Sequence, residues 1–258
     1  MQECGQAGYP VAFDWGPSGA AALSGADLLV VVDVLSFTTT LTVAADRGIP
    51  VVPCPWRDER AGALAREHRA TLATPRGRGE VSLSPGTVRS ATGLDRLVLP
   101  SPNGATIAAA APGPVLGVSL RNRAATARWL RSRVDAGDRV AVIAAGERWP
   151  DGTLRAAVED LWGAGALLAA LGPETLSPEA RAAAAAAVPV LDDPLGMLHG
   201  CGSGRELAAI GYAGDVDMAA EIDSSDAVPL LADGVFLPAG GRHGSRDARP
   251  GDGPGRGW

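Results

Sequence analysis

The stretch VVVDVLSFTTT, from Val30 to Thr40, joins an apolar run to a cluster of hydroxyl side chains. Its β-branched residues are typical of an interior strand, where an unpaired carboxylate such as that of Asp33 is costly. Two interpretations follow: Asp33 closes a strand end, or it takes part in the chemistry of a site. Because serine and threonine often begin helices, we expect a helix directly after this strand.

Three later segments repeat this order of strand, polar turn and helix. Their strands are expected in RLVLP (96–100), PVLGVSL (114–120) and RVAVIAAG (139–146). Strands that alternate with helices at this spacing predict an α/β fold around a largely parallel or mixed sheet. In such sheets ligands bind beyond the carboxyl ends of the strands, which is where the polar residues of all four units fall.

The remaining segments are less regular. Before Asp27, glycine and proline allow one short strand at most. We expect a further strand and an arginine-rich helix over 51–70, an alanine-rich helix over 173–187, and then two helices and a short final strand. One domain is predicted over 1–239, which could contain two subdomains, with a disordered tail over 240–258 because that tail has almost no apolar residue.

Composition limits the classes of partner. The net charge is −6, lysine is absent, and arginines do not form runs with interleaved aromatic residues, so a nucleic-acid surface is not expected. Cys4, Cys54 and Cys201 are far apart and form no CxxC pair, which fits a reducing compartment. No signal-peptide pattern or membrane-length apolar run is present, so we expect a cytoplasmic protein that does not contact the membrane.

The hydroxyls behind Asp33 have two interpretations. Ser36, Thr38 and Thr39 could cap the helix, which is the commonest use of such residues. A carboxylate followed by hydroxyls also suits a magnesium ion that bridges to a phosphate. The turn SPNGAT (101–106) could be an ordinary loop, or its residues could bind a ligand, with Ser101, the Asn103 amide and a close backbone approach at Gly104 as the contacts.

Charged residues follow the other two strands. Arg121 is the preferred anion clamp, although a surface salt bridge is the alternative. Glu147 follows the fourth strand directly, and Glu159 and Asp160 lie on the next helix. Since successive helical residues point in different directions, we expect only one of Glu159 and Asp160 to face the site.

These motifs also carry a resemblance. The segments DVLSFTTT, SLSP, SPNGAT, GVSLRNRAATA, AAGERWPDG, VEDLWGAG, SGREL and DVDMAAEIDSSDAVP, in this order, resemble the 2-phosphosulfolactate phosphatase (ComB) family. The resemblance runs from about Leu28 to Leu237. It implies a distinctive three-layer α/β/α fold and a magnesium-dependent acid phosphatase that hydrolyses 2-phosphosulfolactate to 3-sulfolactate and phosphate.

Matching positions extend to single residues. Asp33, the threonines 38–40, Asn103, Gly104 and Asp160 match family residues. Ser36 and Phe37 stand where the family commonly has arginine and alanine, so the resemblance implies that an anion-binding arginine is missing or is supplied by Arg121. Its GNSP loop is SLSP here, and Ser101 and Pro102 replace two threonines.

Two functional hypotheses follow. In the first, magnesium held by Asp33 and Asp160, with Glu147 nearby as a third ligand, neutralises the phosphate of a small phosphorylated acid while Arg121 and the helix start orient it. Water attack and an aspartyl-phosphate on Asp33 are alternative routes. In the second, the chain is a non-catalytic anion-binding module derived from the same family. A homo-oligomer is compatible with both.

Overall fold

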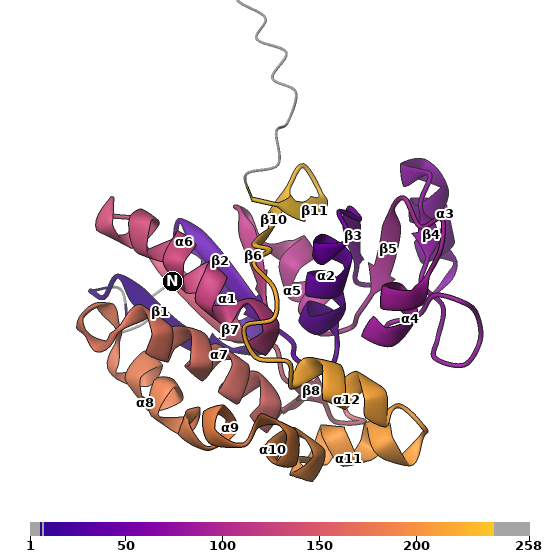
Figure 1. Ribbon diagram of the computed structural model, residues 1–258. Coiled ribbons are helices and arrows are strands. Elements are labelled where there is room, and N and C mark those ends of the chain that lie inside the picture. The colour runs from indigo at the N-terminus through magenta and orange to yellow at the C-terminus, as the bar shows by residue number, and fades with distance from the viewer. Residues whose placement is uncertain (1–5, 7, 240–258) are drawn as a thin grey trace, which may run out of the picture.

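The computed structural model describes residue 6 and residues 8–239, so the tail predicted over 240–258 lies outside the described residues. Its main sheet has nine strands in the order β1-β7-β2-β6-β10-β11-β3-β5-β4 (Figure 1). The strands are β1 Val11–Trp15, β2 Leu28–Val32, β3 Val51–Cys54, β4 Thr71–Leu72, β5 Leu97–Pro100, β6 Val115–Val118, β7 Val140–Ala144, β10 Pro229–Ala232 and β11 Val235–Pro238.

The sheet contains two parallel blocks joined by a hairpin. β1, β7, β2 and β6 are parallel to one another, as are β3, β5 and β4. Between the blocks lies the β10–β11 hairpin, whose strands pair antiparallel with β6 and with β3. The predicted mixed α/β sheet is therefore confirmed. Its last two strands lie in the middle of the sheet and join the two parallel blocks.

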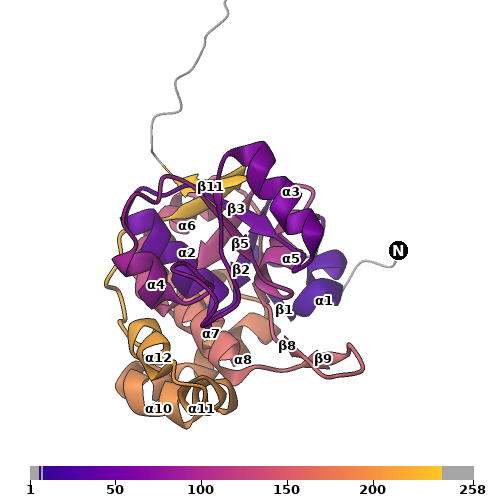
Figure 2. The same ribbon diagram turned by 90° about the vertical axis from the view of Figure 1, so that its right-hand side faces the viewer.

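Helices cover both faces of this sheet. They are α1 Gly16–Ala22, α2 Phe37–Asp46, α3 Glu59–His68, α4 Pro85–Ser90, α5 Gly104–Ala110, α6 Arg123–Asp135, α7 Val158–Leu171, α8 Pro178–Ala186, α9 Val188–Asp192, α10 Pro194–Gly200, α11 Gly202–Ala209 and α12 Ala213–Ala219. The 3₁₀ turns are Leu120–Asn122 and Pro173–Thr175. A separate hairpin, β8 Glu147–Arg148 and β9 Leu154–Arg155, projects beside the sheet (Figure 2).

Alternate residues of β2 divide the core into two halves. Val30 and Val32 pack in one hydrophobic cluster with residues of α6 to α12, whereas Leu29 and Val31 pack in another with residues of α1, α2, α4 and α5. All five β2 residues are buried, as expected for a central parallel strand covered on both faces. The three-layer architecture is therefore confirmed.

Some elements differ from the sequence-based prediction. Helix α1 was not predicted, because Gly16, Pro17 and Gly19 were interpreted as loop residues, yet proline suits the first turn of a helix. The single final strand is in fact the β10–β11 hairpin, which turns at Asp233 and Gly234. Within the described residues, we find no helix long and apolar enough to span a membrane.

Candidate active site

Asp33 follows β2 directly, and its carboxylate joins two elements. One oxygen accepts a hydrogen bond from the backbone N–H of Gly104 at 2.8 Å and from the Ser101 hydroxyl at 3.1 Å. The other accepts from the N–H of Phe37 at 3.2 Å, at the start of α2. Asp33 therefore connects the carboxyl ends of β2 and β5. The sequence predicted this contact, because Asp33 and the SPNGAT turn each follow a strand.

Gly104 has a steric reason to be glycine. A Cβ at this position would lie 2.7 Å from the Asp33 carboxylate and 2.6 Å from the Phe37 ring. Neither neighbour can retreat easily, because Phe37 is fully buried and Asp33 is held by three hydrogen bonds. The close backbone approach that the sequence suggested for Gly104 is thus directed at Asp33.

The threonine hydroxyls serve the turn between β2 and α2. Thr38 donates to the Asp33 carbonyl at 2.8 Å, and Thr39 donates to the Val34 carbonyl at 2.7 Å. Thr40 donates to the Leu83 carbonyl at 2.7 Å, and all three residues are completely buried. The hydroxyls of Thr38 and Thr39 are thus committed to backbone carbonyls. That this helix start orients a phosphate through its N–H groups stays a prediction.

Asp160 reaches the same strand end from α7. Its two carboxylate oxygens accept from the N–H groups of Val34 at 2.7 Å and Gly146 at 2.8 Å. Glu159 and Asp160 are both buried, with 2% and 3% of their surface exposed. Asp160 bonds the strand end, and the expectation that only one of the two faces the site stays a prediction.

Glu147 and Asn103 complete the predicted group. The Asn103 amide donates to Glu147 at 2.9 Å, and this bond connects β8 to the turn after β5. Ser101, Asn103 and Gly104 therefore all lie at the Asp33 end of the sheet. The structure brings together the acids and the SPNGAT turn, which the sequence proposed as parts of one site.

Burial and mutual repulsion raise the pKa values of three of these acids. Desolvation is the main cause at Asp33, with a smaller contribution from the charge of Glu159. At Asp160 desolvation and the charge of Asp33 hold the pKa well above its usual range, despite two backbone hydrogen bonds that oppose the shift. Burial and then Asp33 also raise the pKa of Glu147. The cluster favours either protons or a bound cation.

Arg121 does not join this cluster, which corrects its proposed role as the anion clamp. Its guanidinium lies 2.8 Å from the carboxylate of Asp46, the last residue of α2, and 3.1 Å from that of Glu221. Asp33, by contrast, contacts the first residue of α2. Arg121 therefore forms buried ion pairs with Asp46 and Glu221 at the opposite end of this helix, where it supports the fold.

A different arginine reaches the start of α2. Arg76 donates to the Ser36 hydroxyl at 2.8 Å and to the Asp215 carboxylate at 3.1 Å. Position 36, where the family commonly has arginine, is therefore close to the guanidinium of Arg76. Sequence reasoning treated Arg76 as part of a turn, since nothing in the local pattern TPRGRGE shows that it reaches a residue 40 positions away.

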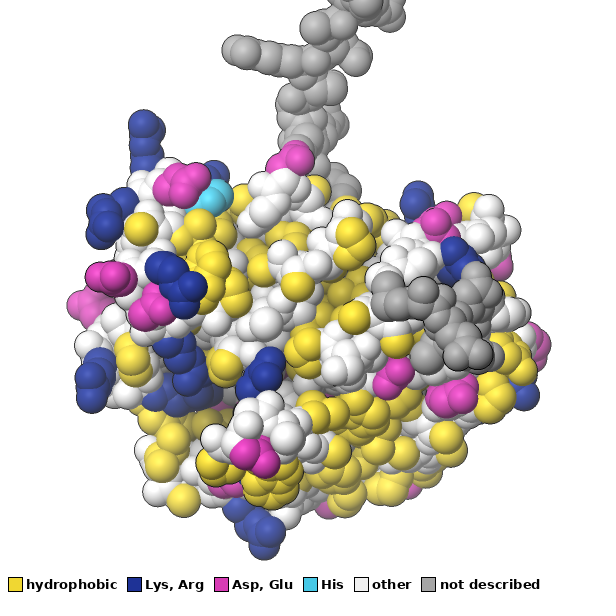
Figure 3. All heavy atoms as spheres, turned by 180° about the vertical axis from the view of Figure 1, so that it is seen from behind, with side chains coloured by type: hydrophobic (Ala, Val, Ile, Leu, Met, Phe, Trp, Pro, Cys, Tyr) yellow, Lys and Arg dark blue, Asp and Glu magenta, His cyan; other side chains and the backbone are white. Residues whose placement is uncertain are grey.

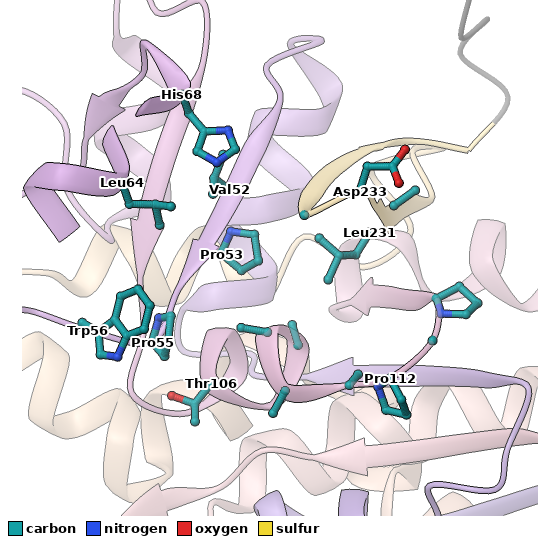
Figure 4. Close-up of a pocket in the computed structure, with 18 residues that line it drawn as sticks. Val52, Pro53, Pro55, Trp56, Leu64, His68, Thr106, Pro112, Leu231 and Asp233 are labelled. Atoms are coloured by element: carbon teal, nitrogen blue, oxygen red, sulfur yellow. The ribbon is translucent and has the colours of Figure 1, made fainter. Parts of the chain in front are cut away.

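An apolar cavity elsewhere on the molecule does not contain these acids. It has a volume of about 790 Å³ and lies among α3, β3, α5 and the β10–β11 turn (Figure 4). Trp56, Leu64 and Leu231 line it, with His68 and Asp233 at its rim.

On the rear face, hydrophobic side chains gather over the middle while arginines concentrate along one edge (Figure 3). Phosphate chemistry needs charged groups, so the acidic cluster is the candidate active site.

Comparisons with known proteins show the family of this chain. A family model described as 2-phosphosulpholactate phosphatase matches residues 20–234. The chain belongs to the 2-phosphosulfolactate phosphatase family. All the acids of the site lie within the matched range, as do the SPNGAT turn, Arg76 and Asp215.

Members of this family from distant organisms are similar over most of their length. A probable 2-phosphosulfolactate phosphatase of Thermus thermophilus is 33% identical, covering 80% of this chain and 88% of the relative. Its counterpart from Deinococcus radiodurans is 31% identical over 83% and 91% of the two chains. The 2-phosphosulfolactate phosphatase of Methanothermobacter thermautotrophicus is 30% identical over 81% and 89%.

Proposed function

We propose that this chain is a magnesium-dependent phosphatase, which hydrolyses 2-phosphosulfolactate or a closely related phosphorylated hydroxy acid to the hydroxy acid and phosphate. The observation that carries the proposal is the group of acids near the carboxyl ends of the strands, the buried Asp33, Glu159 and Asp160 and the half-buried Glu147. Family membership and the names of the relatives support the choice of substrate.

Hydrogen-bond capacity tests whether these residues fit magnesium. An ionised carboxylate offers about four acceptor positions. Three hydrogen bonds occupy those of Asp33, and two occupy those of Asp160, so both keep acceptor capacity. Among the described residues, no three acidic, histidine or cysteine side chains are grouped to hold an ion, so Glu147 is not supported as a third ligand beside Asp33 and Asp160. Two carboxylates are enough for magnesium, which commonly takes one or two together with water and substrate phosphate.

Asp33 and Asp160 would hold the ion, with Glu147 beside them. When bound, magnesium would supply positive charge to the phosphate oxygens, which is the main requirement of phosphoryl transfer. We favour attack by water over an aspartyl-phosphate, because both oxygens of Asp33 already accept hydrogen bonds that reduce their nucleophilicity. A phosphorylated enzyme trapped at Asp33 would contradict this choice.

Glu147 would donate a proton to the leaving oxygen. Its raised pKa keeps a larger protonated fraction near neutrality than an ordinary glutamate has, and the Asn103 amide fixes its position. An alkoxide leaves with difficulty unless it is protonated, particularly when bond breaking runs ahead of bond making. Glu147 therefore has the chemistry of a general acid in this proposal.

The test is phosphate release from 2-phosphosulfolactate and a panel of phosphorylated hydroxy acids, measured with magnesium and with EDTA. Release that needs magnesium supports the proposal. Binding of these esters without release would instead favour an anion-binding module. A cytoplasmic location, which the sequence predicts, stays part of the proposal.

A further inference from the structure

Arg76 is held in place by residues from three other parts of the chain. Its Nε donates to Asp215, which is 3% exposed, and Asp215 in turn accepts a hydrogen bond from Ser84. Its guanidinium also lies 5.3 Å from the ring centre of Tyr212. A long side chain held by an ion pair and an aromatic ring loses little further entropy when it binds a ligand, so this arginine is pre-organised.

The position of Arg76 connects the acidic cluster with a cavity. Its Nη2 bonds Ser36, which precedes the α2 residue whose N–H binds Asp33. Arg76 also lines a cavity of about 290 Å³ together with Arg57, Thr74, Leu83 and Pro100. Pro100 is followed directly by Ser101, whose hydroxyl bonds Asp33. The acids of the site do not line this cavity, but Arg76 and Pro100 connect it with Ser36 and Ser101 beside Asp33.

The charges around this cavity favour an anion. Asp58 also lines it, but the Asp58 carboxylate is paired with Arg60 at 2.6 Å. The negative charge of Asp215 cancels that of Arg76, so the charge of Arg57 makes the surroundings of the cavity positive overall. The two bonds to Ser36 and Asp215 use two of the five N–H donors of Arg76, and a planar guanidinium suits the paired oxygens of a carboxylate or sulfonate.

We propose that Arg76 is a specificity-determining residue that binds a second acidic group of the substrate, a sulfonate or carboxylate, while the phosphate lies at the acidic cluster. The inference rests on the proposed function, which it extends. Arg57 contributes charge at the far side of the same cavity, and Asp215 positions Arg76 without contacting substrate. The enzyme should therefore prefer phosphate esters with an acidic group near the ester carbon over simple alkyl phosphates.

Three esters of secondary alcohols test this assignment: 2-phosphosulfolactate, 2-phospholactate and 2-propyl phosphate. They share the type of leaving group but differ in acidic groups. Arg76→Met should lower kcat/KM for 2-phosphosulfolactate by at least about 30-fold, since it removes one partner of a charge-assisted bond. The same variant should change kcat/KM for 2-propyl phosphate by less than about threefold. Equal losses on both esters, or no loss on either, would overturn the proposal.

Two more variants separate binding from folding. Arg78→Met changes an exposed arginine of the same loop and should leave all three substrates unaffected. Asp215→Asn should raise KM for 2-phosphosulfolactate several-fold while kcat stays nearly constant, because Arg76 is present but less well fixed. Thermal melts of each variant confirm the fold. If Arg76→Met does not fold, Arg57→Met should show the same substrate-dependent loss with a smaller amplitude.

Failure of the proposed function gives a different pattern. If the wild-type protein hydrolyses none of the esters, calorimetry with 3-sulfolactate still tests Arg76. Binding that weakens at least about tenfold in Arg76→Met but is unchanged in Arg78→Met supports the role of Arg76 without turnover. Equal affinity in the wild type and both variants, or no binding to the wild type, rejects it.

Discussion

At the scale of single residues, Asp33 has three hydrogen-bond partners and a raised pKa, and in the proposed function it is a magnesium ligand. We predict that Asp33→Asn abolishes magnesium-dependent phosphate release, with a loss of about 1000-fold or more, because charge neutralisation supplies most of the catalysis. A phosphate-release assay with magnesium and with EDTA measures the loss.

The control is Asp95→Asn, which changes an exposed aspartate and should retain full activity. Anion binding to Asp33→Asn, measured by calorimetry, should be preserved or strengthened because one negative charge is gone. Retained turnover in this variant would remove Asp33 from the mechanism.

Glu147 gives a prediction about pH. A carboxyl group with a raised pKa stays protonated to higher pH, so an activity that needs its proton falls as pH rises through that pKa. Glu147→Gln should lower kcat for 2-phosphosulfolactate about 100-fold and flatten the alkaline limb of the pH profile. With p-nitrophenyl phosphate, whose leaving group needs no proton, the loss should be below about fivefold. Equal losses on both esters would contradict a general acid.

At the scale of elements, the N-terminal turn of α7 buries Asp160 beside Asp33. Its pKa is raised on folding, so the contribution of Asp160 to stability is present below the ordinary aspartate pKa and is lost as pH rises through the folded value. Between pH 5 and 8 in EDTA, the stability of the wild type should therefore fall relative to that of Asp160→Asn as pH rises, because the side chain of the variant does not titrate.

Thermal melts of both proteins across this pH range measure the difference in stability. Magnesium should reduce this difference, because it stabilises only the wild type. A difference that does not depend on pH would mean that Asp160 is already compensated without a cation.

The turn between β2 and α2 allows a test of whether the threonine hydroxyls support the fold. Thr39→Val keeps the shape of the side chain but removes the hydrogen bond to the Val34 carbonyl. We expect a loss of about 1 kcal/mol in the free energy of unfolding, measured with urea, because a buried acceptor loses its donor. KM should change less than about threefold. A large rise in KM with unchanged stability would restore Thr39 as a phosphate ligand.

The elements also show what sequence could and could not predict. Periodicity located β2, β3, β5, β6 and β7, because each is an apolar run that ends at a turn. Strand-end position then predicted that Asp33, Ser101, Asn103 and Glu147 lie together, whereas Asp160 lies on α7 and was added by the family resemblance. The direction of long side chains was not predictable: Arg121 follows a strand as Asp33 does, yet it turns to Asp46 at the other end of α2. Arg76 was missed because its partners Ser36 and Asp215 are distant in sequence.

At the scale of the whole molecule, Arg121 links α2 with the segment that follows α12. Its guanidinium pairs with Asp46 and Glu221, and its carbonyl accepts from the N–H of Ser225. Arg121→Met should lower the free energy of unfolding by about 1 kcal/mol, because the partly exposed Asp46 loses its arginine while Glu221 keeps its pair with Arg89. Its kcat/KM should stay within about threefold at temperatures where it is folded. Arg128→Met, in an exposed pair with Asp226, is the control and should change stability little.

The β10–β11 hairpin has a consequence for synthesis on the ribosome. Residues 229–238 are made after all the other strands of the sheet, yet they lie between β6 and β3 in its middle. Until they emerge, the edges of β6 and β3 have no partner, and exposed edges of this kind pair readily with other chains. Asp33 comes from one parallel block and Gly104 from the other, so the nascent chain should gain activity only after the hairpin leaves the exit tunnel.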